Sequence, residues 1–210
     1  MELLKTKNYK NCQELVQRAA ASLEAGKLVA FPTETVYGLG VDANNEQAVA
    51  RLFQVKKRPL DKPLTLHLAD QNQLYNWWPN LMQIARRLVE RFMPGPITLV
   101  LPRPERTLSY WTNFNLSRVG VRVPKCALAQ AIFRVAKVPI VATSANLSDA
   151  ASPTTAQQVL VDLGEKIDLV IDGGKVPVGI VSTVLDVTPQ AVAVLRSGAI
   201  KAAEIQKVLP

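Results

Sequence analysis

The chain has 210 residues, of which 48% are hydrophobic and 20% charged, so it can bury one sizeable core and does not belong to the disordered class. Its 25 basic and 17 acidic residues give a formal net charge of +8, which favours an anionic partner such as a nucleotide, a nucleic acid or a membrane surface. Two distant cysteines, one histidine and no apolar run near about 20 residues argue against a disulfide framework, a metal site built from protein side chains and a membrane span. We therefore expect a cytoplasmic protein without a signal peptide.

In chain order, Asn11 and Glu14 resemble a capping box that begins the first helix. Its apolar stripe includes Cys12, which we interpret as core packing, and Gly26 is a natural stop. The apolar run 28–31 predicts a buried strand. The remaining predicted helices cover 45–56, 81–92, 127–136, 154–163 (capped by Thr154) and 202–209, and the remaining predicted strands cover 64–68, 97–101, 119–123, 139–142, 169–171, 182–187 and 191–195.

Strands alternate with helices early in the chain and cluster late. This pattern predicts an α/β fold with a twisted mixed parallel/antiparallel sheet flanked by helices. With no repeat and no linker-like segment, we expect a single domain over 1–210, with its core at about 12–200. The irregular stretch 102–117 is a candidate lid or binding loop, or a surface excursion.

The stretch 31–40, Phe-Pro-Thr-Glu-Thr-Val-Tyr-Gly-Leu-Gly, follows the first buried strand. Pro32 ends that strand, and we expect Gly38 and Gly40 to let the backbone bend tightly. Hydroxyls left at a strand end, together with the cations of 56–62, are the chemistry of an anion site, most simply a phosphate site.

Polar residues also follow or interrupt other apolar runs. A Thr or Ser after a strand is more often a turn residue, a lone His is more often a core or surface residue, and the lysines at 56–57 could be a solvated helix end. Their recurrence at several strand ends nevertheless indicates one polar, cation-lined cleft. The residues that recur in this way are Thr33, Thr35, Tyr37, His67, Arg122, Thr143, Ser144, Asn146, Ser182, Thr183 and Arg196.

Several chemistries lack their sequence signatures. The chain has no Gly-rich phosphate loop ending in Lys-Ser/Thr and no Gly-x-Gly-x-x-Gly after a strand. The sole histidine has no obvious catalytic neighbours by spacing, which argues against a serine nucleophile with a His–Asp pair. A site that orients reactants and neutralises charge remains.

At these residues the sequence resembles the threonylcarbamoyl-AMP synthase family, which has the YrdC-like fold. The resemblance covers about 12–200, and its motifs are specific as an ordered set. They are Pro32–Gly40, Lys56-x-Arg58-Pro59, Lys62-Pro63-Leu64, His67–Asp70, Pro94–Thr98, Val121–Pro124, Thr143-Ser-Ala-Asn146, Ser182-Thr-Val184 and Leu195-Arg-x-Gly198. The resemblance implies a nucleotidyltransferase that makes threonylcarbamoyl-AMP and pyrophosphate from L-threonine, bicarbonate or CO2, and ATP with its Mg²⁺. Separate proteins would then transfer the threonylcarbamoyl group to tRNA.

The resemblance also implies roles for individual residues. Lys56 and Arg58 would be catalytic. Threonine would be held by Thr35, His67, Arg122, Thr143 and Ser182, and ATP by Arg58, Lys62, Ser144, Asn146, Ser152, Arg196 and, as a weaker candidate, Arg118.

Two positions depart from the family pattern. Asp149 stands where the family usually has Gly, and an acid there could weaken anion binding or perturb the loop that leads to Ser152. Ser197 stands where Pro is frequent. The chain ends soon after Gly198, so we expect the short, single-domain kind. The alternatives are a non-catalytic RNA-binding module of the same fold and, more remotely, a domain that uses carbamoyl phosphate.

Overall fold

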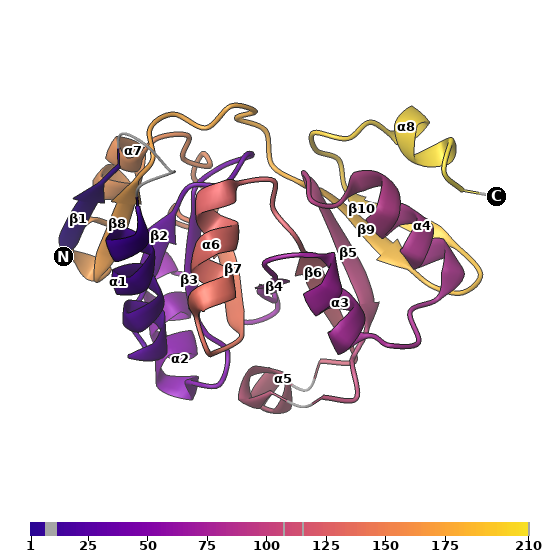
Figure 1. The fold of residues 1–210 in the computed structure, drawn as a ribbon, viewed down its shortest axis with the longest axis horizontal. Helices are drawn as coiled ribbons and strands as arrows, with labels where there is room; N and C mark the ends of the chain where they lie inside the picture. Colours follow the sequence, from indigo (N-terminus) through magenta and orange to yellow (C-terminus); the bar gives the residue numbers. More distant parts are fainter. Residues whose placement is uncertain (7–11, 107, 115, 210) are drawn as a thin grey trace.

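The computed structural model describes residues 1–6, 12–106, 108–114 and 116–209, and their strands form one ten-stranded sheet with helices packed against it (Figure 1). In spatial order the strands are β1 (Glu2–Lys5), β8 (Leu169–Asp172), β2 (Val29–Phe31), β3 (Gly38–Asp42), β7 (Ile140–Ser144), β4 (Thr65–His67), β6 (Arg118–Arg122), β5 (Ile97–Pro102), β9 (Thr183–Val187) and β10 (Val192–Arg196). Both parallel pairs, such as β4–β6, and antiparallel pairs, such as β5–β6, occur. The predicted mixed α/β sheet is confirmed.

The helices cover the two faces of the sheet unequally. They are α1 (Gln13–Glu24), α2 (Glu46–Lys56), α3 (Gln71–Trp77), α4 (Gln83–Phe92), α5 (Ser109–Phe114), α6 (Ala127–Val135), α7 (Ala156–Asp162) and α8 (Ala202–Gln206), with a 3-10 turn at Gly164–Lys166. One core cluster joins α1 and α6 to β2, β7 and β8. The other helices contribute to a larger cluster with β3, β4, β5, β6 and β9. On the face that α1 and α6 cover, β4, β6, β5 and β9 have no helix of that cluster over them.

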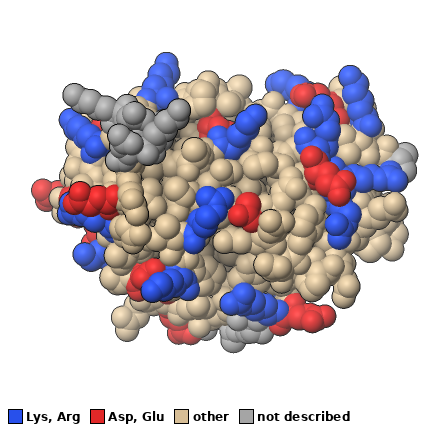
Figure 2. Space-filling view, viewed as in Figure 1, with Lys and Arg blue, Asp and Glu red and all other residues tan. Residues whose placement is uncertain are grey.

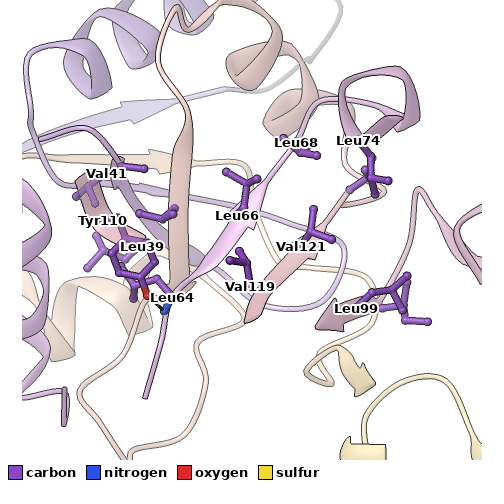
Figure 3. Close-up of a cluster of buried hydrophobic side chains, with 14 of the residues drawn as sticks. Leu39, Val41, Leu64, Leu66, Leu68, Leu74, Leu99, Tyr110, Val119 and Val121 are labelled. Atoms are coloured by element: carbon purple, nitrogen blue, oxygen red, sulfur yellow. Dashed lines mark hydrogen bonds between the residues drawn. The ribbon is translucent and has the colours of Figure 1, made fainter. Parts of the chain in front are cut away.

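The larger cluster uses alternate residues of the central strands. Figure 3 shows Leu66 of β4 beside Val119 and Val121 of β6, and all three side chains are buried. Because successive residues of a strand point to opposite faces, the residues between them lie on the other face. That face therefore receives Thr65, Gly120 and their polar neighbours along the same strands.

Strand β3 was not predicted, because its glycines were interpreted as a bend. It pairs antiparallel with both β2 and β7. A Cβ at Gly38 would lie 2.9 Å from a ring atom of Phe31, and one at Gly40 would lie 2.8 Å from the same ring. These glycines therefore serve close packing of an aromatic ring against a strand, and the bend was a wrong interpretation.

Two helix starts differ from the prediction. Helix α1 is preceded by Cys12, which is partly exposed, makes no side-chain cap and lies 2.6 Å from the Thr6 hydroxyl. The core assignment of Cys12 was therefore wrong, and the predicted cap Asn11 lies outside the described residues. Helix α7 is capped by Thr155, whose hydroxyl accepts from the Gln158 N–H, one residue after the predicted cap.

The sequence also missed β1, α3 and α5. In α3 the capping residue is Asp70, whose carboxylate accepts from the backbone N–H of Gln73. The stretch 102–117 contains α5, and Leu108 and Tyr110 within it are buried in the larger core. This stretch is therefore packed in part, and not a simple surface excursion. Among the described residues, no helix is both long and apolar enough to cross a bilayer.

Candidate active site

A cavity of about 310 Å³ lies on the same sheet face as α1 and α6, over the part of that face which these helices leave uncovered. Strand β6 shows how the sequence builds its floor, because Arg118, Gly120 and Arg122 line the cavity while the two valines between them enter the core. Gly120 leaves space in the cavity floor beside Thr65, since a Cβ at this position would lie 3.3 Å from the Thr65 hydroxyl oxygen. The lining residues are Thr33, Val36, Tyr37, Gly38, Arg58, Pro63, Leu64, Thr65, His67, Thr98, Val100, Arg118, Gly120, Arg122, Ala142, Thr143, Ser144, Val181, Ser182, Val184, Leu195 and Arg196.

One end of the cavity is built around a buried arginine. Nη2 of Arg122 donates to Oε1 of Glu34 and to the hydroxyl of Thr35, each at 2.7 Å. Arg122 and Glu34 are both nearly buried, so this ion pair is little screened by water. The guanidinium is thus fixed at the cavity wall, in a position where it can grip a carboxylate.

The hydroxyls beside this arginine form a directed chain. Thr33 donates to the Val36 carbonyl at 2.6 Å, so in the 2.9 Å contact between the two hydroxyls Thr35 must be the donor to Thr33. Thr35 also accepts from Arg122 and is fully buried. The Thr35 hydroxyl is therefore occupied within the protein and orients Arg122, while Thr33, not Thr35, lines the cavity.

His67 adjoins Arg122 in register and completes this end. Burial, with a smaller contribution from the positive charge of Arg122, lowers the pKa of His67 to about 3. Nδ1 lies 3.0 Å from the Thr65 carbonyl oxygen, which can only accept, so we assign the proton of the neutral ring to Nδ1 and a lone pair to Nε2. The rings of Phe31 and Phe133 pack edge-on against it.

A second polar group joins β9, β5 and the end of β10. The Ser182 hydroxyl lies 2.9 Å from that of Thr98 and accepts from Nη2 of Arg196 at 3.0 Å. Arg196 also donates to the Ser182 carbonyl. Burial lowers the pKa of Arg196, and the charges of Arg122 and Arg58 lower it further. The cations around this cavity are therefore close enough to repel one another.

Two cations of the loop after α2, Arg58 and Lys62, are more exposed, and we call this region the mouth of the cavity. Arg58 lines the cavity and donates to the carbonyls of Lys62 and Pro63, at 2.7 and 3.0 Å. Lys62 does not line the cavity, and its ammonium lies 3.1 Å from the carboxylate of Asp149. Asp149 has a φ of 66°, in the left-handed region where glycine is favoured. A glycine, which the family resemblance implies at this position, would adopt this conformation without strain.

Arg118 lines the cavity at the start of β6. Its Nη2 donates to the carbonyls of Val100 and Val187, at 2.9 and 2.8 Å, and pairs with the carboxylate of Asp186. Among the described residues, no Asp or Glu lines the cavity, whereas four arginines do. The cavity therefore carries an excess of positive charge and is suited to anions.

Lys56 and Asn146 form a buried connection behind the cavity. The Lys56 ammonium donates to the carbonyls of Ser144, at 2.6 Å, and Asn146. Burial, followed by the charge of Arg58, lowers the pKa of Lys56 to about 7. The Asn146 amide donates to the carbonyls of Leu147 and Ala150, each at 2.7 Å. These contacts hold the 144–150 loop to the end of α2.

The structure thus brings most of the proposed residues to one cavity. Those lining it are Arg58, His67, Arg118, Arg122, Thr143, Ser144, Ser182 and Arg196, whereas Thr35, Lys56, Lys62, Asn146 and Ser152 do not line it. The sequence interpretation missed Glu34, Thr65, Thr98 and Asp186 as members of the site. For Thr65 the signal was available, because it shares a strand face with His67. The pairing of Glu34 with Arg122 joins residues 88 apart in sequence and had no local signal.

On the face of the molecule shown in Figure 2, basic and acidic side chains are interspersed. The net charge of +8 is therefore not gathered there into one continuous basic surface. The arginine-lined cavity is the more specific anion-binding feature.

Known proteins resemble this chain closely. The Sua5/YciO/YrdC family model, described as "Telomere recombination", matches residues 21–198. A protein of Pyrococcus abyssi named threonylcarbamoyl-AMP synthase is 44% identical over 194 residues, 92% of this chain and 57% of the relative. Relatives with the same name in Bacillus subtilis (42%; 92% of this chain and 56% of the relative) and Vibrio vulnificus (38%; 75% and 86%) also match. The chain thus spans little more than half the length of the first two.

Solved structures agree with these sequence matches. The structure of P. abyssi Sua5 complexed with L-threonine has a TM-score of 0.89 and 40% identity, over 99% of this chain and 60% of that chain. Escherichia coli YciO has a TM-score of 0.82 and 25% identity, over 94% of both chains. The resemblance seen in the motifs is confirmed, and with a family model that covers most of its length, the chain belongs to the Sua5/YciO/YrdC family.

Proposed function

We propose that this protein is a threonylcarbamoyl-AMP synthase, which converts L-threonine, bicarbonate or CO2 and Mg–ATP into threonylcarbamoyl-AMP and pyrophosphate. The observation that supports this most is a single cavity lined by a buried arginine, Arg122, and by three further arginines. The proposal is also supported by the names of the relatives and by the threonine complex of one of them.

The buried end of the cavity suits the amino acid. Arg122 would bind the threonine carboxylate, with the hydroxyl of Ser182 beside it. Nε2 of the neutral His67 ring can accept a hydrogen bond from the threonine hydroxyl. The surrounding positive charge disfavours a bound ammonium and so favours the neutral amine, which is the nucleophilic form.

In the first step the amine attacks the carbon of CO2 and gives an N-carboxylate and a proton, or it attacks the carbon of bicarbonate and gives an N-carboxylate and water. In the second step this carboxylate attacks the α-phosphorus of ATP. The bond from the α-phosphorus to its bridging oxygen breaks, and pyrophosphate leaves with that electron pair. The chemistry is therefore nucleotidyl transfer between two anions, and its barrier is largely electrostatic.

The arginines can lower that barrier. Arg58 and Arg196 line the cavity and would neutralise the phosphates. Lys62, at the mouth, would leave its ion pair with Asp149 and bind a phosphate instead. Mg²⁺ would arrive on the triphosphate as part of the substrate. The described side chains include no cluster of three or more His, Cys, Asp or Glu that could hold a metal ion. Lys56 would act indirectly, through the loop that carries Ser144 and Asn146.

The test is incubation with Mg–ATP, bicarbonate and threonine, omitting each in turn, with pyrophosphate and the adenylate measured. We expect both products only when all three substrates are present. Binding to RNA that weakens steeply with salt, without any ATP turnover, would instead support the RNA-binding alternative. The product is a reactive mixed anhydride, so we propose that tRNA and separate transfer proteins consume it downstream.

A further inference from the structure

Glu34 forms the only ion pair among the described residues in which both side chains are nearly buried, each being 7% exposed. Its Oε1 accepts from Arg122 at 2.7 Å. The backbone on either side is also held, because Val178 and Gly179 donate their N–H groups to the carbonyls of Glu34 and Thr35, each at 3.0 Å. The backbone that carries this carboxylate is therefore held by a segment that is distant in the sequence.

Both contacts of Arg122 converge on one nitrogen. Nη2 donates to Glu34 and to Thr35 at the same distance, and the Thr35 hydroxyl is in turn directed by Thr33. Two fixed acceptors on one nitrogen set the plane of the guanidinium. Because the guanidinium N–H groups lie in that plane and both hydrogens of Nη2 are already donated, the plane decides how the remaining N–H groups of Arg122 meet a ligand carboxylate.

Burying the ion pair of Glu34 and Arg122 costs desolvation free energy. Oε2 of Glu34 and Nε of Arg122 are buried and have no hydrogen-bond partner among the described residues. A buried ion pair of this kind often stabilises a fold no more than apolar residues of similar volume would. Stability alone therefore does not account for Glu34 at this position, whereas orientation of a ligand-binding arginine does.

We propose that Glu34 is a positioning residue for amino-acid recognition: its carboxylate holds Arg122 in the orientation that binds the carboxylate of threonine. This role rests on the proposed function. Glu34 does not line the cavity, so it acts through Arg122 and not by touching the substrate. Loss of Glu34 should weaken the binding of threonine selectively and leave the nucleotide end of the cavity intact.

The experiment measures two dissociation constants by calorimetry for each variant, one for L-threonine and one for Mg²⁺ with a non-hydrolysable ATP analogue. For Glu34→Ala we expect the threonine constant to rise at least tenfold and the nucleotide constant to stay within twofold. For Glu34→Gln, whose amide oxygen can still accept from Arg122, we expect a smaller threonine-specific rise of at least threefold. If the alanine variant does not fold, the glutamine variant decides by the same criteria.

Asp168→Asn is the matched control, because it removes the carboxylate of another ion pair, with Arg51, outside the cavity. It should change neither constant. Threonine binding within twofold of the parent in the Glu34 variants would overturn the proposed role, and so would equal weakening of both ligands. If the parent chain binds the nucleotide analogue but not threonine, the proposed function itself fails, and the role of Glu34 fails with it.

Discussion

The two ends of the cavity are built differently. At the buried end, Arg122 is held by two side-chain acceptors and lies beside a neutral histidine. At the mouth, Arg58 donates to two backbone carbonyls and to no side chain of the described residues, and Lys62 pairs with an exposed acid. The buried end is thus ordered before any ligand arrives, whereas the mouth keeps cations that a polyanion can recruit. This difference suits a small ligand that needs a preorganised site at the buried end and a flexible triphosphate at the mouth.

Removal of Arg122 should be the most damaging change to the buried end. We expect Arg122→Ala to weaken threonine binding on the order of 1,000-fold, because truncating one member of a buried, hydrogen-bonded charge pair costs about 2–5 kcal/mol. It also leaves Glu34 without its partner, so the free energy of unfolding should fall. Calorimetry and urea denaturation measure the two effects. Arg134→Ala, which removes an exposed arginine paired with Asp70 at 3.5 Å, is the control and should leave threonine binding unchanged.

Removal of Arg58 should separate catalysis at the mouth from folding. We expect Arg58→Ala to lower threonine-dependent pyrophosphate release by at least about 100-fold, because it removes a preorganised charge from the phosphates. Arg58 is partly exposed, so the fold should persist by circular dichroism. The neighbouring exposed Lys57 does not line the cavity, and Lys57→Gln should release pyrophosphate at the parent rate. Near-normal turnover of Arg58→Ala would remove it from the mechanism.

The neutral state of His67 at the buried end should make the stability of the fold depend on pH. Since the pKa of His67 is near 6.5 in the unfolded chain and about 3 in the folded protein, the unfolded state binds the extra proton between these values. The free energy of unfolding should therefore fall as the pH drops from about 6.5 toward 3, by up to about 1.4 kcal/mol per pH unit. Above that window His67 contributes no pH dependence.

His67 is the only histidine, so its C2 proton can be followed by NMR without further assignment. Its chemical shift should stay constant between pH 5 and pH 8 at about the values of a neutral ring. In urea-unfolded protein the same proton should titrate near 6.5. A titration midpoint near 6.5 in the folded state would show that the ring is not held neutral.

The smallest effect concerns Lys62 at the mouth. We expect Asp149→Gly to lower the KM for ATP by about two- to fivefold, the range for loss of an exposed ion pair, because Lys62 becomes free for phosphate. It should not destabilise the fold, since residue 149 has a φ of 66°. Asp149→Asn removes the charge without introducing glycine and should lower the KM similarly. An unchanged KM in both variants would mean that Asp149 does not compete with phosphate.

Local patterns predicted much of the fold. The predicted helix at 45–56 is α2, whose cap Asn45 accepts from the Ala48 N–H, and the predicted strand at 119–123 is β6. Patterns failed where tertiary contacts overrode them. Gly38 and Gly40 belong to a strand because the Phe31 ring needs the space above them, and this requirement cannot be read from the residues that flank them.

For the candidate site, the sequence supplied the types of residue but not their contacts. Arg58, His67, Arg122 and Arg196 were expected in one cleft, and the structure brings them to one cavity. It places Lys56 behind that cavity instead, with its ammonium on two carbonyls. In the sequence, Lys56 and Arg58 look like equivalent basic residues. In the structure, the Lys56 side chain at the end of α2 points inward, whereas the Arg58 side chain lines the cavity.

By itself, the sequence determined the membership of the chain in its family, its mixed α/β class and the supply of arginines and hydroxyls at strand ends. Period-two alternation and helix caps are local properties, so they can be read along the chain. Only the tertiary structure decided which charges are paired. Glu34 pairs with Arg122, 88 residues away in the sequence, because strand order and burial bring distant segments together. The low dielectric of the interior then strengthens the electrostatic attraction between them.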